Sequence, residues 1–262
     1  MTSVNLENIP ANFSFQGRSA SVPEIGEVVI HVAEITAMTS QDLTLLSLEE
    51  QEKARSMTTP AVRERFVAGR KMIRQNLSLW LGADPSAICM EVGESGKPFV
   101  KEDPSLHFSI SHSGELLMAA FSRTEIGVDL ERQRDIQTEA LAKRFFSSEE
   151  ARYLNECSDG DTVSDDFFRL WTCREAAIKA DGRGMGSLLA STRVVLPPKP
   201  INPIHPIESA ASEHSRAEMN EILEVMIANE CWQVLPWRVR GGYHAALALR
   251  QRPTLIHWRD FR

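Results

Sequence analysis

Two stretches of this chain carry the same local patterns in the same order, and this repetition constrains the fold more than any other feature. Each stretch contains a capping box, in which a serine accepts from a free backbone N–H at a helix start and a glutamate reaches back. The two boxes are Ser47 with Glu50 and Ser147 with Glu150. An apolar helical stripe follows each box, and then a strand of small and apolar residues, at 116–121 and 243–249. The order indicates a duplication, with chance similarity between short helical patterns as the alternative.

A duplication predicts an α+β fold of two pseudo-symmetric halves that pack face to face, with a ligand site in the cleft between them. Residues 66–70 can be aligned with residues 170–174 in this comparison. We expect the first α+β half to span residues 1–125 and the second to span residues 126–262.

The second half contains additional residues before its last strand. Several prolines precede a third capping box, formed by Ser215 and Glu218. We therefore expect a proline-rich surface insertion near 197–230, with a helix over about 215–228.

Composition and charge argue against several classes of protein. The 262 residues suffice for one large domain or two smaller ones, and a hydrophobic content of 42% is ordinary for a soluble globular protein. The net charge of −7 argues against a nucleic-acid partner, and the apolar stretches are too short to cross a membrane. The chain shows no secretory signal pattern, and its cysteines have no metal-type spacing. We expect a cytoplasmic monomer with reduced thiols.

Residues 126–131 are predicted to form a strand with an unusual polar face. Alternation places Gly127, Asp129 and Glu131 together on the face opposite the apolar residues. The two carboxylates repel each other unless water or a cation separates them, and the glycine leaves room for another group to approach. The alternative is a solvated strand edge.

A helix is predicted over residues 167–179, ending at a glycine-rich loop. Glu175 and Lys179 are one turn apart, so they share a face, where a simple surface ion pair is the alternative to a functional role. Earlier in the chain, residues 108–114 form a predicted strand whose end carries Ser111 and His112. These side chains offer donors to an anion, although such a histidine can also be ordinary polar surface.

Taken in order, these segments resemble the Sfp-type 4′-phosphopantetheinyl transferases, the two-domain class that activates peptide and polyketide synthetases. The resemblance covers roughly residues 45–189. The matching motifs lie at 96–98, 108–113, 127–131, 142–147 and 171–179, followed by Gly182 and Gly184. Their order and spacing carry the resemblance, because each motif alone is weak.

The resemblance implies an enzyme of the holo-[acyl-carrier-protein] synthase class. Such an enzyme transfers the 4′-phosphopantetheine group of coenzyme A to a carrier-protein serine and releases 3′,5′-ADP. It also implies Mg²⁺, held by Asp129, Glu131 and Glu175 together with pyrophosphate oxygens and water. With Asp129, the implied catalytic residues are Glu175, as the base that takes the serine proton, and Lys179, beside the pyrophosphate.

The resemblance further implies a set of residues that contact coenzyme A: Lys53, Arg65, Gly96, Lys97, Pro98, Ser111, His112 and Lys179. The serine and the histidine would contact phosphates, the Gly-Lys-Pro segment would border the adenine, and the first two cations would bind the 3′-phosphate. Two positions depart from the family pattern. Glu50 stands within the basic set, and Arg174 occupies a position usually filled by lysine.

The resemblance places the carrier protein beside the segment that follows Glu131. Acidic carriers would meet a small basic rim here, supplied by Arg132, Arg134, Lys143 and Arg144. An apolar contact could come from Ile136, Phe145 and Phe146, unless the two aromatic residues pack in the core and the basic residues are merely solvated.

Two other functions remain open. The chain could be a coenzyme A-binding protein of the same fold that has lost catalysis, although its intact carboxylate set argues against this. It could also be a structural or interaction protein whose motifs are solvated faces and turns. Fatty-acid, polyketide, nonribosomal-peptide, siderophore and lysine-pathway carriers are all compatible with the sequence.

Overall fold

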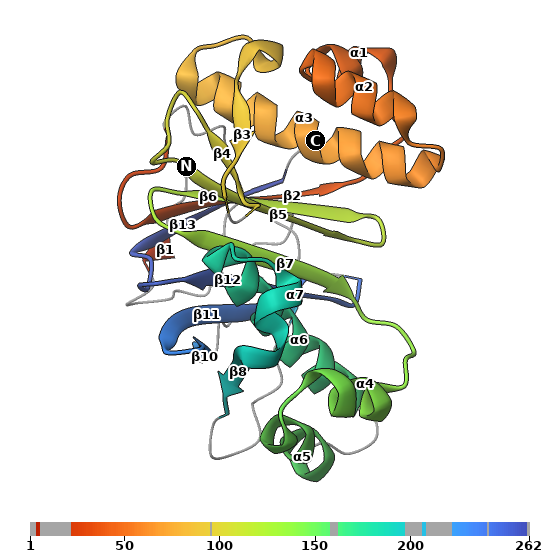
Figure 1. Ribbon diagram of the computed structural model, residues 1–262, viewed down its shortest axis with the longest axis vertical. Coiled ribbons are helices and arrows are strands. Elements are labelled where there is room, and N and C mark those ends of the chain that lie inside the picture. Colours follow the sequence, from red (N-terminus) through yellow and green to blue (C-terminus); the bar gives the residue numbers. More distant parts are fainter. Residues whose placement is uncertain are drawn as a thin grey trace.

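Two β-sheets pack face to face in the middle of the molecule, and helices lie at both ends of its long axis (Figure 1). The computed structural model describes residues 4–5, 22–94, 96–157, 162–196, 206–207, 222–239 and 241–260. Helices α1, α2 and α3 lie at one end, and helices α4 and α5 lie at the other. The predicted α+β fold of two similar halves is confirmed.

The first sheet has the strand order β1-β13-β2-β6-β5. Its strands are β1 (Val4–Asn5), β2 (Glu27–Glu34), β5 (His107–Ser113), β6 (Leu116–Ser122) and β13 (Leu255–Asp260). The helices of this half are α1 (Ser40–Thr44), α2 (Leu48–Ser56) and α3 (Pro60–Leu81), with a 3₁₀ turn at Pro85–Ala87. A separate hairpin is formed by β3 (Met90–Val92) and β4 (Pro98–Val100).

The second sheet has the strand order β7-β12-β11-β10-β8, and β9 pairs with β11. Its strands are β7 (Ile126–Arg132), β8 (Thr192–Val195), β9 (Pro206–Ile207), β10 (Leu223–Ile227), β11 (Glu230–Val239) and β12 (Tyr243–Leu249). The helices are α4 (Thr138–Phe145), α5 (Ser148–Cys157), α6 (Thr162–Asp181) and α7 (Met185–Leu188), with a 3₁₀ turn at Leu189–Ser191.

The alternation of side chains along the strands explains the layered core. One face of each sheet contributes to a shared apolar layer between the sheets, which includes Val28, Ile30, Val128, Leu130 and Trp237. The outer face of the first sheet packs on α3, and that of the second packs on α6. Each half is therefore a sheet with one principal helix, and the shared layer joins them.

The predicted capping boxes at Ser47 and Ser147 are both present, because each serine accepts from the N–H of the glutamate that bonds back. The third, at Ser215 and Glu218, lies outside the described residues. The helix predicted over about 215–228 is wrong where it can be checked, because Leu223–Ile227 forms strand β10. Alternate residues of this strand are buried, which is the strand period, and the predicted insertion near 197–230 therefore ends before β10.

The repeat is visible in two buried ion pairs. Arg74 of α3 lies 2.6 Å from Glu50, and Arg174 of α6 lies 3.0 Å from Glu150. Both arginine side chains are at most 2% exposed. Arg174 therefore corresponds to Arg74, and the predicted alignment of 66–70 with 170–174 is shifted by about one helical turn.

The order of strands in the first sheet corrects the expected assignment of residues 126–262 to the second half. Strand β13 pairs in parallel with β2, with Leu255 opposite Glu27. Ile256 and Trp258 then enter the apolar layer between the sheets. The described helices include none long and apolar enough to span a lipid bilayer.

Candidate active site

The two halves meet where strand β5, at the edge of the first sheet, lies beside strand β7, at the edge of the second. Three serines of β5 accept hydrogen bonds from backbone N–H groups of β7, at N–O distances of 3.0–3.2 Å. The pairs are Val128 to Ser109, Leu130 to Ser111 and Arg132 to Ser113. Side chains alternate along a strand, so every second residue of β5 reaches every second N–H of β7. We call this set the serine ladder.

The serine ladder also binds the carboxylates of β7. Ser111 Oγ donates to Asp129 Oδ1 at 2.8 Å, and Ser113 Oγ donates to Glu131 Oε2 at 2.8 Å. Lys179 Nζ lies 2.6 Å from Asp129 Oδ1 and 2.9 Å from Ser111 Oγ. Asp129 is buried, and the Glu175 carboxyl also makes a hydrogen bond to it.

Gly127 allows helix α6 to pack directly on β7. A Cβ at this position would lie 2.0 Å from the carbonyl oxygen of Ala176 and 2.3 Å from the backbone N of Ala180. The group that approaches the glycine is therefore helix backbone. This close packing brings Glu175 and Lys179 of α6 to the carboxylates of β7.

Glu175 is buried, and burial raises its pKa to about 8. The negative charge of Asp129 adds to this rise, Lys179 opposes it, and the charge of Glu131 adds a further contribution. The structure thus brings together the three carboxylates predicted to hold Mg²⁺. Among the described residues, however, no three acidic, histidine or cysteine side chains form a preassembled metal site. The predicted metal role stays a prediction.

A pocket of roughly 240 Å³ opens beside Lys179 and is lined by residues of both halves. Its lining consists of Gly96, Lys97, Pro98, Phe108, Ser109, Ile110, Ile178, Lys179, Gly182 and Gly184. Four of the residues predicted to contact coenzyme A therefore line it. The apolar wall was missed, although strand alternation in the matched 108–113 segment could have indicated Phe108 and Ile110.

Lys97 crosses between the halves within the pocket wall. Its Nζ donates to the carbonyl oxygens of Ile126 and Ala180, each at 2.9 Å. Burial lowers its pKa to about 8, against the opposing charges of Glu125 and Asp181. The head group of Lys97 thus bonds to protein backbone, while the residue also lines the pocket.

The remaining predicted coenzyme A residues lie outside the pocket lining. His112 is exposed, and its pKa is lowered by partial desolvation and then by the charges of Arg65 and Lys179. The cations Arg65 and Lys179 therefore both lie near the His112 ring. Lys53 is exposed on α2, with its Nζ 5.4 Å from the ring centre of Phe66.

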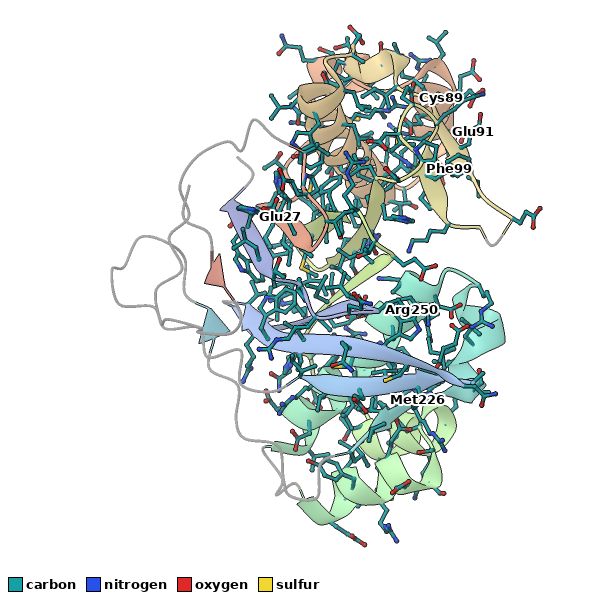
Figure 2. All side chains as sticks on the ribbon, turned by 90° about the vertical axis from the view of Figure 1, so that its left-hand side faces the viewer. Glu27, Cys89, Glu91, Phe99, Met226 and Arg250 are labelled. Carbon is teal, nitrogen blue, oxygen red and sulfur yellow. The ribbon has the colours of Figure 1, made fainter. Side chains whose placement is uncertain are left out.

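The glycine loop at the pocket edge is connected to the second sheet through charged groups. Arg183 bonds both carboxylate oxygens of Asp181 and lies 3.6 Å from Glu230. Arg250, labelled in Figure 2, bonds Glu230 at 2.7 Å and Glu125 at 3.0 Å. Gly182 and Gly184 of this loop line the pocket.

The two departures from the family pattern are both explained by structural roles. Glu50 caps α2 and pairs with Arg74. Arg174 Nη1 binds Glu150, and its Nη2 donates to the carbonyl oxygen of Leu189. Arg174 does not line the pocket, and its positive charge is directed at Glu150 and Leu189 within the second half.

The segment predicted to face the carrier protein is largely exposed. Its four basic residues, Arg132, Arg134, Lys143 and Arg144, are all exposed. Phe146 packs in the core as the alternative interpretation expected, and half-buried Phe145 contacts Trp171. Arg134 differs from its neighbours, because its Nη1 lies 3.1 Å from Glu131 Oε2.

Comparison with known proteins covers both halves. A model of the 4′-phosphopantetheinyl transferase superfamily matches residues 125–248, and a model of the 4′-phosphopantetheinyl transferase N-terminal region matches residues 35–124. The 4′-phosphopantetheinyl transferase Sfp of Bacillus subtilis is 36% identical over 154 residues, which are 59% of this chain and 68% of that protein. HetI, a 4′-phosphopantetheinyl transferase of Nostoc sp., is 37% identical over 166 residues, which are 61% of this chain and 70% of HetI.

A shorter match involves a third bacterial protein. Gsp, a 4′-phosphopantetheinyl transferase of Aneurinibacillus migulanus, is 39% identical over 121 residues, which are 46% of this chain and 49% of Gsp. The two family models meet between residues 124 and 125, at the start of β7. Because family models match both halves and relatives are 36–37% identical, this chain belongs to the 4′-phosphopantetheinyl transferase superfamily.

Proposed function

We propose that this enzyme performs its family's reaction, the transfer of 4′-phosphopantetheine from coenzyme A to a carrier-protein serine, at a magnesium site formed by Asp129, Glu131 and Glu175. The observation that carries the proposal is the buried carboxylate cluster beside a pocket shared by the two halves. Asp129 is buried there against the Glu175 carboxyl, and this pair of carboxyl groups is a setting in which a cation would favour both ionised forms.

The donor set fits Mg²⁺. This ion prefers oxygen ligands and usually keeps several waters, binding through one or two carboxylates and substrate phosphate oxygens. A complete protein cage is therefore not needed. When bound, Mg²⁺ would neutralise negative charge on the cluster and on the pyrophosphate of coenzyme A.

The reaction requires a base for the incoming hydroxyl. The carrier serine oxygen forms a bond to the β-phosphorus of coenzyme A, the bond from that phosphorus to the departing 3′,5′-ADP breaks, and the serine proton must be removed. Glu175 is our proposed base, directly or through a water, because it lies in the carboxylate cluster beside Asp129 and Lys179, where a bound cation would favour its ionised form. Lys179 would move part of its contact from Asp129 to the leaving phosphate.

Coenzyme A has an apolar and an anionic part, and the pocket region offers both kinds of surface. Phe108, Ile110 and Pro98 would receive the adenine. Arg65 and Lys179, which lie near the His112 ring, form the cationic region that would receive phosphates, and Lys53 would extend it to the 3′-phosphate. We also propose that the enzyme acts as a cytoplasmic monomer on acyl or peptidyl carriers, and the identity of the carrier is left to experiment.

The direct test is incubation with coenzyme A, Mg²⁺ and a panel of apo carrier proteins. We expect a mass gain on at least one carrier and equimolar release of 3′,5′-ADP. Asp129→Ala should lower turnover by about a hundredfold or more, the scale of losing a key electrostatic group. Near-normal turnover of that variant under saturating Mg²⁺ would end the metal proposal. Binding of coenzyme A with no mass gain on any carrier would favour a protein that has lost catalysis.

A further inference from the structure

Ser113 makes two hydrogen bonds that join the two halves at Glu131. Its Oγ accepts from the backbone N–H of Arg132 at 3.0 Å and donates to Glu131 Oε2 at 2.8 Å. The first bond fixes the hydroxyl relative to strand β7, so the second bond fixes the carboxylate relative to the same strand. Arg134 Nη1 adds a contact of 3.1 Å to the same oxygen. Glu131 Oε1 receives no hydrogen bond from the described residues.

The same arrangement occurs one step along the serine ladder. Ser111 accepts from the N–H of Leu130 and donates to Asp129 Oδ1. In both pairs, a serine of the first half holds one carboxylate oxygen of the second half. A carboxylate held in this way is oriented before a ligand arrives, and this lowers the entropic cost of binding.

Ser109 provides an internal comparison. It accepts from the N–H of Val128 at 3.0 Å, as the other two serines do from their partners. The next residue of β7, Asp129, is bound by Ser111. Ser109 contacts no carboxylate among the described residues. Ser109 therefore shares the joining role of the ladder and lacks the carboxylate contact.

We propose that Ser113 is a positioning residue that orients Glu131 for a divalent cation, so that the first half of the chain presets a ligand of the second. This inference rests on the proposed magnesium function and deepens it. Outer hydrogen-bond partners of metal ligands typically change metal affinity by about 10–100-fold when they are removed. We expect an effect of this size when the Ser113 hydroxyl is removed. The fold should change little, because the Arg132 N–H lies at the exposed end of β7 and can donate to water instead.

The experiment measures Mg²⁺ binding to the enzyme–coenzyme A complex by calorimetry, without carrier protein, so that no turnover occurs. Ser113→Ala should raise the Mg²⁺ dissociation constant by about tenfold. Ser113→Thr keeps the hydroxyl and should bind within about twofold of the wild type. Tyr243→Phe removes another hydrogen bond between the halves, from the Glu115 N–H to the Tyr243 hydroxyl, without touching a carboxylate or the pocket, and its Mg²⁺ affinity should also stay within about twofold. Turnover against Mg²⁺ concentration should show the same order.

Equal Mg²⁺ affinities of Ser113→Ala and the wild type would overturn the role of Ser113 while leaving the magnesium proposal standing. Equal weakening by Ser113→Ala and Tyr243→Phe would also overturn it, because the effect would then come from joining the halves. A wild-type complex that binds no Mg²⁺ would overturn both proposals. If Ser113→Ala does not fold, Ser113→Cys carries the same test, since a thiol is a much weaker donor and should also weaken Mg²⁺ binding.

Discussion

At the scale of single residues, the buried position of Glu175 has a cost for the metal-free protein. Its carboxyl has an ordinary pKa of 4.5 and a folded-state pKa raised to about 8 by burial and by Asp129. A raised folded-state pKa stabilises the fold fully below pH 4.5, and that contribution is lost as pH rises toward 8. Glu175→Gln removes the titration, so it should make the metal-free fold more stable than the wild type at pH 8, on the order of 2 kcal/mol.

Denaturant unfolding in a chelating buffer, at pH values from about 5 to 8.5, would measure this difference. The gap between Glu175→Gln and the wild type should close as the pH falls. Glu149→Gln, on the exposed surface of α5, is the matched control and should follow the wild-type curve. A Glu175→Gln curve parallel to that of the wild type would contradict the buried, charge-coupled placement.

At the scale of elements, helices α3 and α6 are each joined to the preceding helix by the same kind of contact. A buried arginine pairs with the capping glutamate and also donates to a carbonyl oxygen farther along the chain, at Ile88 for Arg74 and at Leu189 for Arg174. Lysine cannot span two acceptors as a guanidinium does. Arg174→Lys should therefore lower the free energy of unfolding by about 1–3 kcal/mol and leave the KM for coenzyme A unchanged.

Arg74→Lys is the equivalent change in the first half and should cost a similar amount. Thermal melting and initial-rate kinetics on both variants would separate stability from catalysis. If Arg174→Lys raised the KM for coenzyme A several-fold while Arg74→Lys did not, then Arg174 would contact the substrate despite its place outside the pocket lining.

These elements also show why some parts of the fold could be predicted and others could not. Capping boxes and the alternation over 126–131 are local patterns, and both were found in the sequence. The prediction for residues 223–227 was wrong because the helix expected for the polar residues before them was extended into this segment. The burial of these residues alternates as in a strand. Tertiary context decides such short segments.

The same distinction between local patterns and tertiary contacts applies to the candidate site. Asp129, Glu175 and Lys179 could be named because the motifs that contain them resemble a known family. The contacts that hold them could not be named, because Ser113 and Glu131 are 18 residues apart and meet only when two different sheets adjoin. The pairing of Arg174 with Glu150 escaped prediction for the same reason, since it depends on how α5 packs against α6.

At the scale of the whole molecule, we propose that the carrier protein docks on the basic rim that follows β7. Arg134 is a poor residue for testing this surface, because it also contacts Glu131. Arg132→Glu combined with Arg144→Glu avoids that contact. The double variant should raise the KM for an acidic carrier by about tenfold at low salt and leave the KM for coenzyme A nearly unchanged, since rim charges mainly govern association.

Arg193→Glu is a matched control, because exposed Arg193 lies on β8, the edge strand opposite β7 in the second sheet. Steady-state kinetics at several salt concentrations would compare the variants. Added salt should weaken the wild-type reaction more than that of the double variant. Normal carrier kinetics of the double variant at low salt would place the docking surface elsewhere.

The parallel pairing of β13 with β2 also sets an order of events during synthesis. A ribosome releases residues 27–122 long before residues 255–260, so the edge of β2 that β13 covers stays open while the second half is being made. An open strand edge can pair with other chains and lead to aggregation. The first sheet is completed only after the second has been synthesised, so the two halves of this enzyme mature together and not one after the other.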